Sequence, residues 1–309
     1  MNKVQTDDII SRLPHVRGEY RFAEPLKKYT WLNIGGPAEV MFFPADVDDL
    51  QYFMQHKDVN LPVFVLGGGS NLLVRDGGVA GVVIKLKNPN FAQFSIQNNV
   101  LKCGAGALNT SMKKMIADNG LGGLEFLCSI PGSIGGLVRT NAGCFGRELS
   151  DVLVSAQVVD CRGEVMTIGK NDFHFDYRHS DFPQDWIILE VNLQFEHVAP
   201  ELVTAKIKAN DDYRRQHQPQ GIRTAGSTFK NPSGYRAWEL IKNSGGSEIV
   251  VGGVRMSPQH CNFLENDGTA TAADVENLGK KIMKAVKNQT GVDLEWEIKI
   301  VGQEQKVGC

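Results

Sequence analysis

Two glycine-rich segments, each bordered by apolar residues of strand type, constrain the fold of this chain most strongly. The first covers residues 66–71 (LGGGSN) and the second residues 130–143 (IPGSIGGLVRTNAG). Glycine lets the main chain approach a ligand closely and adopt positive φ, so that backbone N–H groups can hold a diphosphate. A single cluster among 33 glycines is more often a tight turn. Two dense clusters reduce the weight of that alternative and favour a dinucleotide cradle.

The commoner nucleotide and metal motifs are absent. Neither G-x-G-x-x-G nor G-x-x-x-x-G-K-[ST] occurs, because the glycines at 67–69 are followed by Ser-Asn-Leu. A standard Rossmann or P-loop site is therefore disfavoured. His174 and His179 are five residues apart, without an H-E-x-x-H motif or a cysteine pair, so no metal site is predicted.

Charge and apolar patterning exclude several classes of partner. Lys plus Arg number 33 against 35 Asp plus Glu, so the net charge of -2 provides no broad basic surface for nucleic acid. Arg214, Arg215 and His217, with Arg223 nearby, form either a site for a small phosphorylated ligand or a solvated helix end. The polar, acidic N-terminus and the absence of an 18-residue apolar run predict a cytoplasmic protein without membrane contact. Six cysteines without C-x-x-C spacing predict reduced thiols.

The pattern of apolar residues predicts a mixed chain of helices and strands in two or three lobes, since 309 residues exceed the usual single domain of about 100 to 200. Asp46 with Asp49, and Thr271 with Asp274, predict capped helix starts. Pro200 follows a shift in composition and marks the preferred boundary of the last lobe. The expected strands are 38–43, 61–66, 82–86, two within 152–165, 189–195 and 294–301, with a hairpin at 94–96 and 100–103; the expected helices are 46–56, 108–119, 201–215, 237–243 and 272–287.

Five segments in order along the chain carry a family resemblance: LGGGSNLLV at 66–74, IPGSIGGLVRTNAG at 130–143, DYRHS at 176–180, GSTFKNP at 226–232 and LEWEIKIVG at 294–302. Together they resemble the UDP-N-acetylenolpyruvoylglucosamine reductases, over roughly residues 30–302. The first two segments point only to the flavin superfamily, and the last three point to this reductase. The chain lacks a long insertion between DYRHS and GSTFKNP, so it is similar to the shorter subclass without a tyrosine-bearing loop. It departs from the family at Phe145, where a tyrosine is common, and at His217, where a lysine is common.

The resemblance implies an α+β fold, with a two-lobed FAD-binding domain of the vanillyl-alcohol oxidase type and a C-terminal α+β substrate-binding domain. The implied first FAD-binding lobe is 1–86, including a polar leader at 1–20 and with the C-terminal strand as a candidate addition. The second lobe is 87–199, and the substrate-binding domain is 200–309. The implied reaction is reduction of the enolpyruvyl ether of UDP-N-acetylglucosamine enolpyruvate to UDP-N-acetylmuramate, for peptidoglycan precursors. FAD is the implied cofactor, NADPH the electron donor, a UDP-sugar the substrate, and a monomer the expected state.

The resemblance also implies three catalytic residues. Arg178 would stabilise charge on the substrate carboxylate, Ser227 would donate a proton to the carbanion, and Glu297 would orient Ser227 or stabilise charge. Without the resemblance, the sequence favours a surface ion pair for Arg178 and a hydroxyl in a Gly-Ser turn for Ser227. It favours a solvent-facing carboxylate on an alternating strand for Glu297. The implied cofactor-binding residues are Leu66, Gly67, Gly68, Gly69, Ser70, Asn71, Leu72, Pro131, Gly132, Ser133, Gly135, Gly136, Asn141, Ala142 and Gly143. The implied substrate-binding residues are Lys230, Asn231, Arg214 and Arg223.

Two other functions remain open. A flavin oxidase of the same superfamily, acting on an alcohol or hydroxy acid, would explain both glycine segments but leaves GSTFKNP and LEWEIKIVG unexplained. A catalytically inactive flavin- or nucleotide-sugar-binding regulator would have no chemical need to keep Arg178, Ser227 and Glu297 together.

Overall fold

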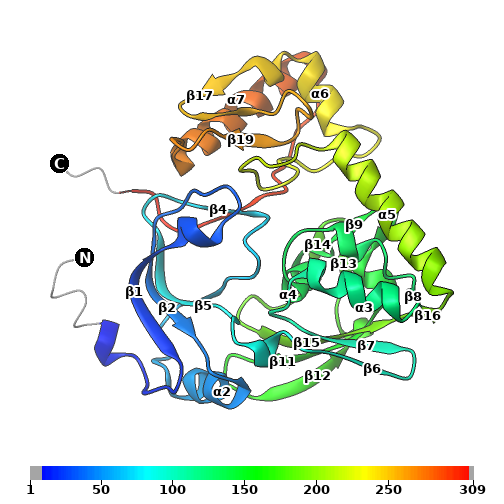
Figure 1. Ribbon diagram of the computed structural model, residues 1–309. Helices are drawn as coiled ribbons and strands as arrows, with labels where there is room; N and C mark the ends of the chain where they lie inside the picture. Colours follow the sequence, from blue (N-terminus) through cyan, green and yellow to red (C-terminus); the bar gives the residue numbers. More distant parts are fainter. Residues whose placement is uncertain (1–8, 306–309) are drawn as a thin grey trace. The chain divides into compact units, whose positions relative to one another are not determined.

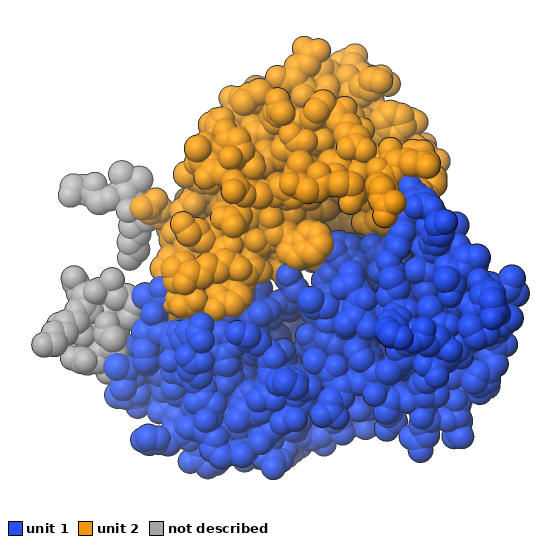
Figure 2. Space-filling model, viewed as in Figure 1, with its two compact units in different colours: residues 1–23, 40–68, 81–212 blue, residues 24–39, 69–80, 213–309 orange. Residues whose placement is uncertain are grey.

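The computed structural model describes residues 9–305, so the first part of the predicted polar leader and Cys309 lie outside the described residues. The chain forms two compact units (Figure 2). Unit 1 comprises Met1–Ala23, Val40–Gly68 and Gly81–Asp212, and unit 2 comprises Glu24–Glu39, Gly69–Ala80 and Tyr213–Cys309. Each unit has its own hydrophobic core. Pro200 is the first residue of helix α5 (Pro200–His217), and the three-part division at 86/87 and 199/200 stays a prediction.

The largest sheet of unit 1 has five antiparallel strands in the order β12-β11-β15-β7-β6. Its central strand β15 alternates as the sequence predicts, because Val191 and Leu193 are fully buried whereas Asn192 and Gln194 are not. The predicted hairpin is confirmed, and Asn98 in its turn has φ of 53°. The strands are β6 (Phe94–Gln97), β7 (Val100–Gly104), β11 (Leu153–Val159), β12 (Val165–Gly169) and β15 (Ile187–Gln194).

A four-stranded sheet has the order β1-β2-β5-β3, with most of its residues in unit 1 (Figure 1). The strands are β1 (Glu19–Pro25), β2 (Pro37–Phe43), β5 (Val79–Ile84) and β3 (Val63–Val65), of which β1 was not predicted. Helix α2 (Val47–His56) begins as predicted, because the Asp46 side chain accepts a hydrogen bond from the Asp49 N–H. The buried Asp49 carboxylate in turn accepts from the main-chain N–H groups of Arg17, Gly18 and Ala45, which holds the segment before β1 against the start of α2.

Two further helices of unit 1 lie near the glycine segments. The predicted helix at 108–119 is a 3₁₀ turn (Asn109–Ser111) followed by α3 (Met112–Asp118). Helix α4 (Ile134–Thr140) lies inside the second glycine segment and packs against β15 and β14. It was not predicted because adjacent glycines are poor helix formers. The short paired strands are β8 (Leu121–Gly122) with β16 (Glu196–His197), β9 (Gly143–Cys144) with β10 (Arg147–Glu148), and β13 (Phe175–Asp176) with β14 (His179–Ser180).

In unit 2, helices α6 (Ala237–Asn243) and α7 (Ala272–Thr290) pack together, and α7 packs against strands of a three-stranded sheet. That sheet consists of β17 (Val250–Val251), β18 (Val254–Met256) and β19 (Leu264–Asn266). Helix α7 begins with the predicted capping box of Thr271 and Asp274. The parallel pair of β4 (Leu72–Val74) and β20 (Lys299–Val301) joins distant parts of the chain. The predicted strand at 294–301 is therefore paired as a ladder only at its end.

The five cysteines within residues 9–305 are free thiols. No helix in that part of the chain has the length and apolarity needed to cross a membrane.

Candidate functional site

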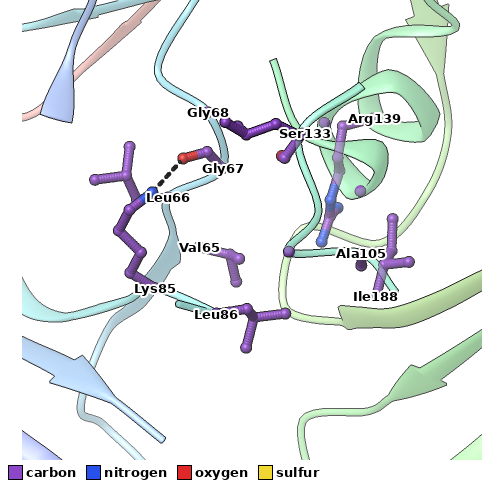
Figure 3. A pocket seen from close by; sticks show the side chains of 14 residues that line it. Val65, Leu66, Gly67, Gly68, Lys85, Leu86, Ala105, Ser133, Arg139 and Ile188 are labelled. Atoms are coloured by element: carbon purple, nitrogen blue, oxygen red, sulfur yellow. Dashed lines mark hydrogen bonds between the residues drawn. The ribbon is translucent and has the colours of Figure 1, made fainter. Parts of the chain in front are cut away.

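The two glycine segments line one pocket of about 550 Å³, including space open to solvent, within unit 1 (Figure 3). The end of β3 and the glycines after it form one side. Residues after β5, residues after β7, helix α4 with the serine before it, and Ile188 of β15 form the rest.

The two segments touch each other through glycine. A Cβ atom on Gly68 would lie 2.7 Å from the Gly132 Cα, and a Cβ on Gly67 would lie 2.6 Å from the Ser133 Oγ. Both distances are shorter than real Cβ contacts, and at Gly68 the obstacle is main chain, so a larger residue there would push the two segments apart. The half-buried glycines of the lining have no side chain between their main chain and the pocket, as a main-chain dinucleotide cradle needs.

Two basic side chains line the pocket, and its described lining includes no aspartate or glutamate. The Lys85 Nζ donates to the Gly67 carbonyl at 2.7 Å, and burial lowers the pKa of Lys85 to about 8, with a smaller contribution from Lys87 (Figure 3). Arg139 projects from α4, and burial lowers its pKa to about 10. Sequence reasoning missed both residues, although a cation inside the second glycine segment was a usable signal. Two cations beside exposed main chain suit an anionic ligand such as a diphosphate.

The predicted cofactor-binding residues fall into three groups. Those that line the pocket are Leu66, Gly67, Gly68, Ser133, Gly135 and Gly136. Pro131, Gly132, Asn141, Ala142 and Gly143 are elsewhere in unit 1, whereas Gly69, Ser70, Asn71 and Leu72 belong to unit 2. The Asn71 amide donates to the Glu297 carbonyl at 3.1 Å, so its side chain holds the strand segment that carries Glu297.

Arg178 lies at the turn between β13 and β14 with φ of 55°, a strained value for a residue other than glycine. Its Nη2 donates to the Gly143 carbonyl at 2.7 Å, and its Nη1 lies 3.7 Å from the Glu148 Oε1. The ion pair expected from residue type alone is present. The same contacts also hold the guanidinium in a defined place, with 20% of the side chain exposed.

Ser227 and Glu297 lie on neighbouring segments of unit 2. The Glu297 N–H donates to the Thr228 carbonyl at 2.9 Å, and Ser227 forms an isolated bridge with Phe263. The structure thus brings the Ser227 and Glu297 segments together, while Arg178 belongs to unit 1.

The predicted substrate-binding residues are all in unit 2. The Lys230 Nζ lies 3.4 Å from the Glu295 Oε2, and the Asn231 Oδ1 accepts from the Ala237 N–H at the start of α6. Arg223 lies against Gly268, where a Cβ atom would clash with its guanidinium. Arg214 is in the last turn of α5. His217, where the resemblance leads us to expect a lysine, has its Nδ1 2.7 Å from the Tyr213 carbonyl oxygen, and its ring stacks on the Tyr213 ring.

No group of three His, Cys, Asp or Glu residues among those described could hold a metal ion.

Comparison with known proteins assigns both parts of the chain. The FAD binding domain model matches residues 38–169, and the model described as "UDP-N-acetylenolpyruvoylglucosamine reductase, C-terminal domain" matches residues 218–301. Curated proteins named UDP-N-acetylenolpyruvoylglucosamine reductase include one from Paramagnetospirillum magneticum, 44% identical with 94% of each chain covered. Another, from Parvibaculum lavamentivorans, is 43% identical, covering 98% of this chain and 97% of its own. The crystal structure of UDP-N-acetylenolpyruvylglucosamine reductase from Thermus caldophilus matches with a TM-score of 0.80 at 33% identity, covering 93% of this chain and 99% of that one.

These matches confirm the predicted fold class, an FAD-binding domain followed by a C-terminal α+β domain, and FAD as the cofactor. They also confirm the prediction of a flavin-containing oxidoreductase. The glycine pocket belongs to unit 1, which contains residues 40–68 and 81–169 of the match to the FAD binding domain model. This chain belongs to the UDP-N-acetylenolpyruvoylglucosamine reductase family.

Proposed function

We propose that this protein uses FAD and NADPH to reduce the enolpyruvyl ether of UDP-N-acetylglucosamine enolpyruvate to UDP-N-acetylmuramate, a step of peptidoglycan precursor synthesis. The pocket shared by the two glycine segments, with Lys85 and Arg139 in its lining, supports the use of FAD, and the match of residues 218–301 to the C-terminal domain of the reductases carries the choice of substrate. Relatives bearing the reductase name match along nearly the whole chain, which supports this substrate over that of a flavin oxidase.

Within the pocket, Gly67, Gly68 and the start of α4 would hold FAD by their main chain, while Lys85 and Arg139 supply positive charge. When bound, FAD supplies the hydride for the vinyl carbon, since flavins carry this redox chemistry. The protein's own part is to bind, to orient and to stabilise charge.

Arg178 would hold the substrate carboxylate and stabilise the negative charge that spreads onto it. A guanidinium stays charged at any physiological pH and can form two parallel hydrogen bonds to a carboxylate. The contacts of Arg178 with Gly143 and Glu148 limit its rotation and favour a prepared position.

Ser227 would hold the proton that neutralises the carbanion, because even a weak hydroxyl acid can protonate so strong a base. Glu297 would orient Ser227 or stabilise charge, and the hydrogen bond between the Glu297 N–H and the Thr228 carbonyl fixes its segment beside that of Ser227. Lys230, Asn231, Arg214 and Arg223 would contact the UDP-sugar. Of these, the exposed ion pair of Lys230 with Glu295 would exchange readily for a phosphate.

We further propose that the enzyme is a cytoplasmic monomer. Light scattering of the FAD-loaded protein tests the oligomeric state: a mass near the 34.0 kDa of one chain is expected, and twice that mass contradicts it.

The visible spectrum of the purified protein tests cofactor and electron donor together. We expect a bound-flavin absorption band that NADPH bleaches within seconds and that UDP-N-acetylglucosamine enolpyruvate restores without oxygen. NADH in a matched anaerobic sample measures the preference between donors. A flavin that is inert to NADPH but bleached by an alcohol or hydroxy acid would favour the oxidase, and ligand binding without turnover would favour the regulator.

A further inference from the structure

Arg139 connects the pocket-lining helix α4 to the segment that follows the β13–β14 hairpin. Its Nη1 donates to the carbonyls of Phe182 and Pro183 at 3.3 and 2.6 Å. Its Nη2 donates to the carbonyls of Gln184, at 3.5 Å, and Trp186. One guanidinium thus ties down a five-residue loop. Hydrogen bonds from a charged donor to carbonyl oxygens are roughly twice as strong as neutral ones.

Aromatic packing fixes the same loop around the guanidinium. The Arg139 Cζ lies 4.7 Å from the centroid of the Phe182 ring. Phe182 stacks on Phe173, with centroids 4.8 Å apart, and Trp186 meets it edge-on at 5.9 Å. Phe173 precedes the hairpin and Phe182 follows it, so the cluster closes the base of the hairpin beside Arg139.

The hairpin itself is fastened to the C-terminal turn of α4. The Ser180 Oγ donates to the Arg139 carbonyl at 3.2 Å, and the Nδ2 of the fully buried Asn141 donates to the Asp176 carbonyl at 3.1 Å. The register pairs Asp176 with His179, which leaves Arg178 at the turn. Positive φ at a non-glycine residue is strained and persists only where the surroundings hold it.

We propose that Arg139 is a positioning residue for Arg178: by tying residues 182–186 to α4, it fixes the hairpin that presents the Arg178 guanidinium. This inference rests on the proposed role of Arg178 in the reaction. A side chain that lines the cofactor pocket thereby also sets the place of a residue that would contact substrate.

Hydrogen exchange tests the structural step without relying on turnover. We expect the Asp181 and Trp186 amides of the FAD-saturated protein to exchange about tenfold faster or more in Arg139→Met than in wild type. The Trp186 N–H bonds the Pro183 carbonyl within the tied segment, and the Asp181 N–H bonds the His174 carbonyl across the base of the hairpin. The exchange rates of these amides in Arg139→Lys should lie between those of wild type and Arg139→Met, since an ammonium group cannot form the same set of hydrogen bonds as a guanidinium.

Arg162→Met is the matched control, because this exposed arginine of unit 1 belongs to the β11–β12 turn, and it should leave the exchange of those amides unchanged. Unchanged exchange in Arg139→Met overturns the proposal. If that variant does not fold, Arg139→Lys, which keeps the charge but cannot form all of these hydrogen bonds, should still accelerate exchange of the same amides, and unchanged exchange there also overturns the proposal.

A double-mutant cycle tests the catalytic step. Arg139→Lys should lower kcat about tenfold in the wild-type background, but less than threefold in Arg178→Ala, because there is then no guanidinium left to position. Equal losses in both backgrounds would mean that Arg139 acts on turnover independently of Arg178 and would overturn the inference. Full turnover of Arg178→Ala would instead refute the role proposed for Arg178, while the exchange data would still decide whether Arg139 fixes the hairpin.

Discussion

Ser227 is the residue whose proposed role depends most on chemistry and least on packing. Replacing Ser227 with alanine removes the proposed proton but leaves the unit 1 pocket unchanged. We expect normal flavin content and normal bleaching by NADPH, while reoxidation by substrate slows by orders of magnitude. Stopped-flow absorbance separates the two half-reactions. Ser244→Ala, at the end of α6, is the control, and wild-type reoxidation in Ser227→Ala would refute the proton-donor role.

Lys85 gives the stability of the apoprotein a specific pH dependence. Burial lowers its pKa from 10.5 to about 8, so between these values the unfolded chain binds the proton and the folded chain does not. Unfolding then takes up a proton, and the contribution of Lys85 to stability increases as the pH rises from 8 to 10.5. We expect the free energy of unfolding of wild type, relative to Lys85→Met, to rise across this range in urea titrations. A difference that is flat or falls would show that the lysine is charged in the folded apoprotein.

At the scale of elements, the contact between the two glycine segments predicts which glycines tolerate a methyl group. In Gly68→Ala the new Cβ would lie 2.7–2.9 Å from main-chain atoms of Gly132 and Ser133, which cannot move aside easily. We expect a loss of about 1–3 kcal/mol in the free energy of unfolding, as is usual for overpacking. Flavin content should also fall. In Gly136→Ala, within α4, the Cβ meets only the Ser133 hydroxyl, at 3.3 Å.

Alanine is the better helix former, so Gly136→Ala should leave the apoprotein at least as stable as wild type, with a gain of up to about 1 kcal/mol. Urea unfolding of both apoproteins makes the comparison. Equal stabilities for the two variants would mean that the glycine segments separate easily.

Local signals in the sequence identified most of the described α-helices and the strands of the five-stranded sheet. Side-chain caps at Asp46 and Thr271 depend on residues three positions apart, and both are present in the structure. Alternation located β15 because that strand has one buried and one less buried side. Helix α4 escaped prediction because tertiary packing against β15 and β14 overrides the low propensity of Gly135 and Gly136.

At the scale of the whole molecule, sequence could indicate boundaries but not which distant segments pair. Unit 2 takes in residues 24–39 and 69–80, and β4 pairs with β20 more than 200 residues away, which no local pattern encodes. For the same reason, Lys85 and Arg139 could not be assigned to one pocket before the fold was known. The residues of the glycine segments that line the pocket were accessible from sequence, since the need for an exposed main chain selects glycine directly.

Because the two units have separate cores, we expect bound FAD to stabilise them unequally. A ligand that binds only the folded state stabilises it by RT ln(1 + [L]/Kd), about 2.7 kcal/mol when FAD is at 100 times its Kd. The pocket is formed entirely by unit 1, so this stabilisation belongs first to the core that contains Leu101 and Val191. We expect FAD to slow hydrogen exchange of those core amides about a hundredfold, while amides around Val275 and Leu278 in unit 2 change much less. Equal slowing in both cores would show instead that the two units unfold in one cooperative step, because only then would a ligand held by one unit protect the other to the same extent.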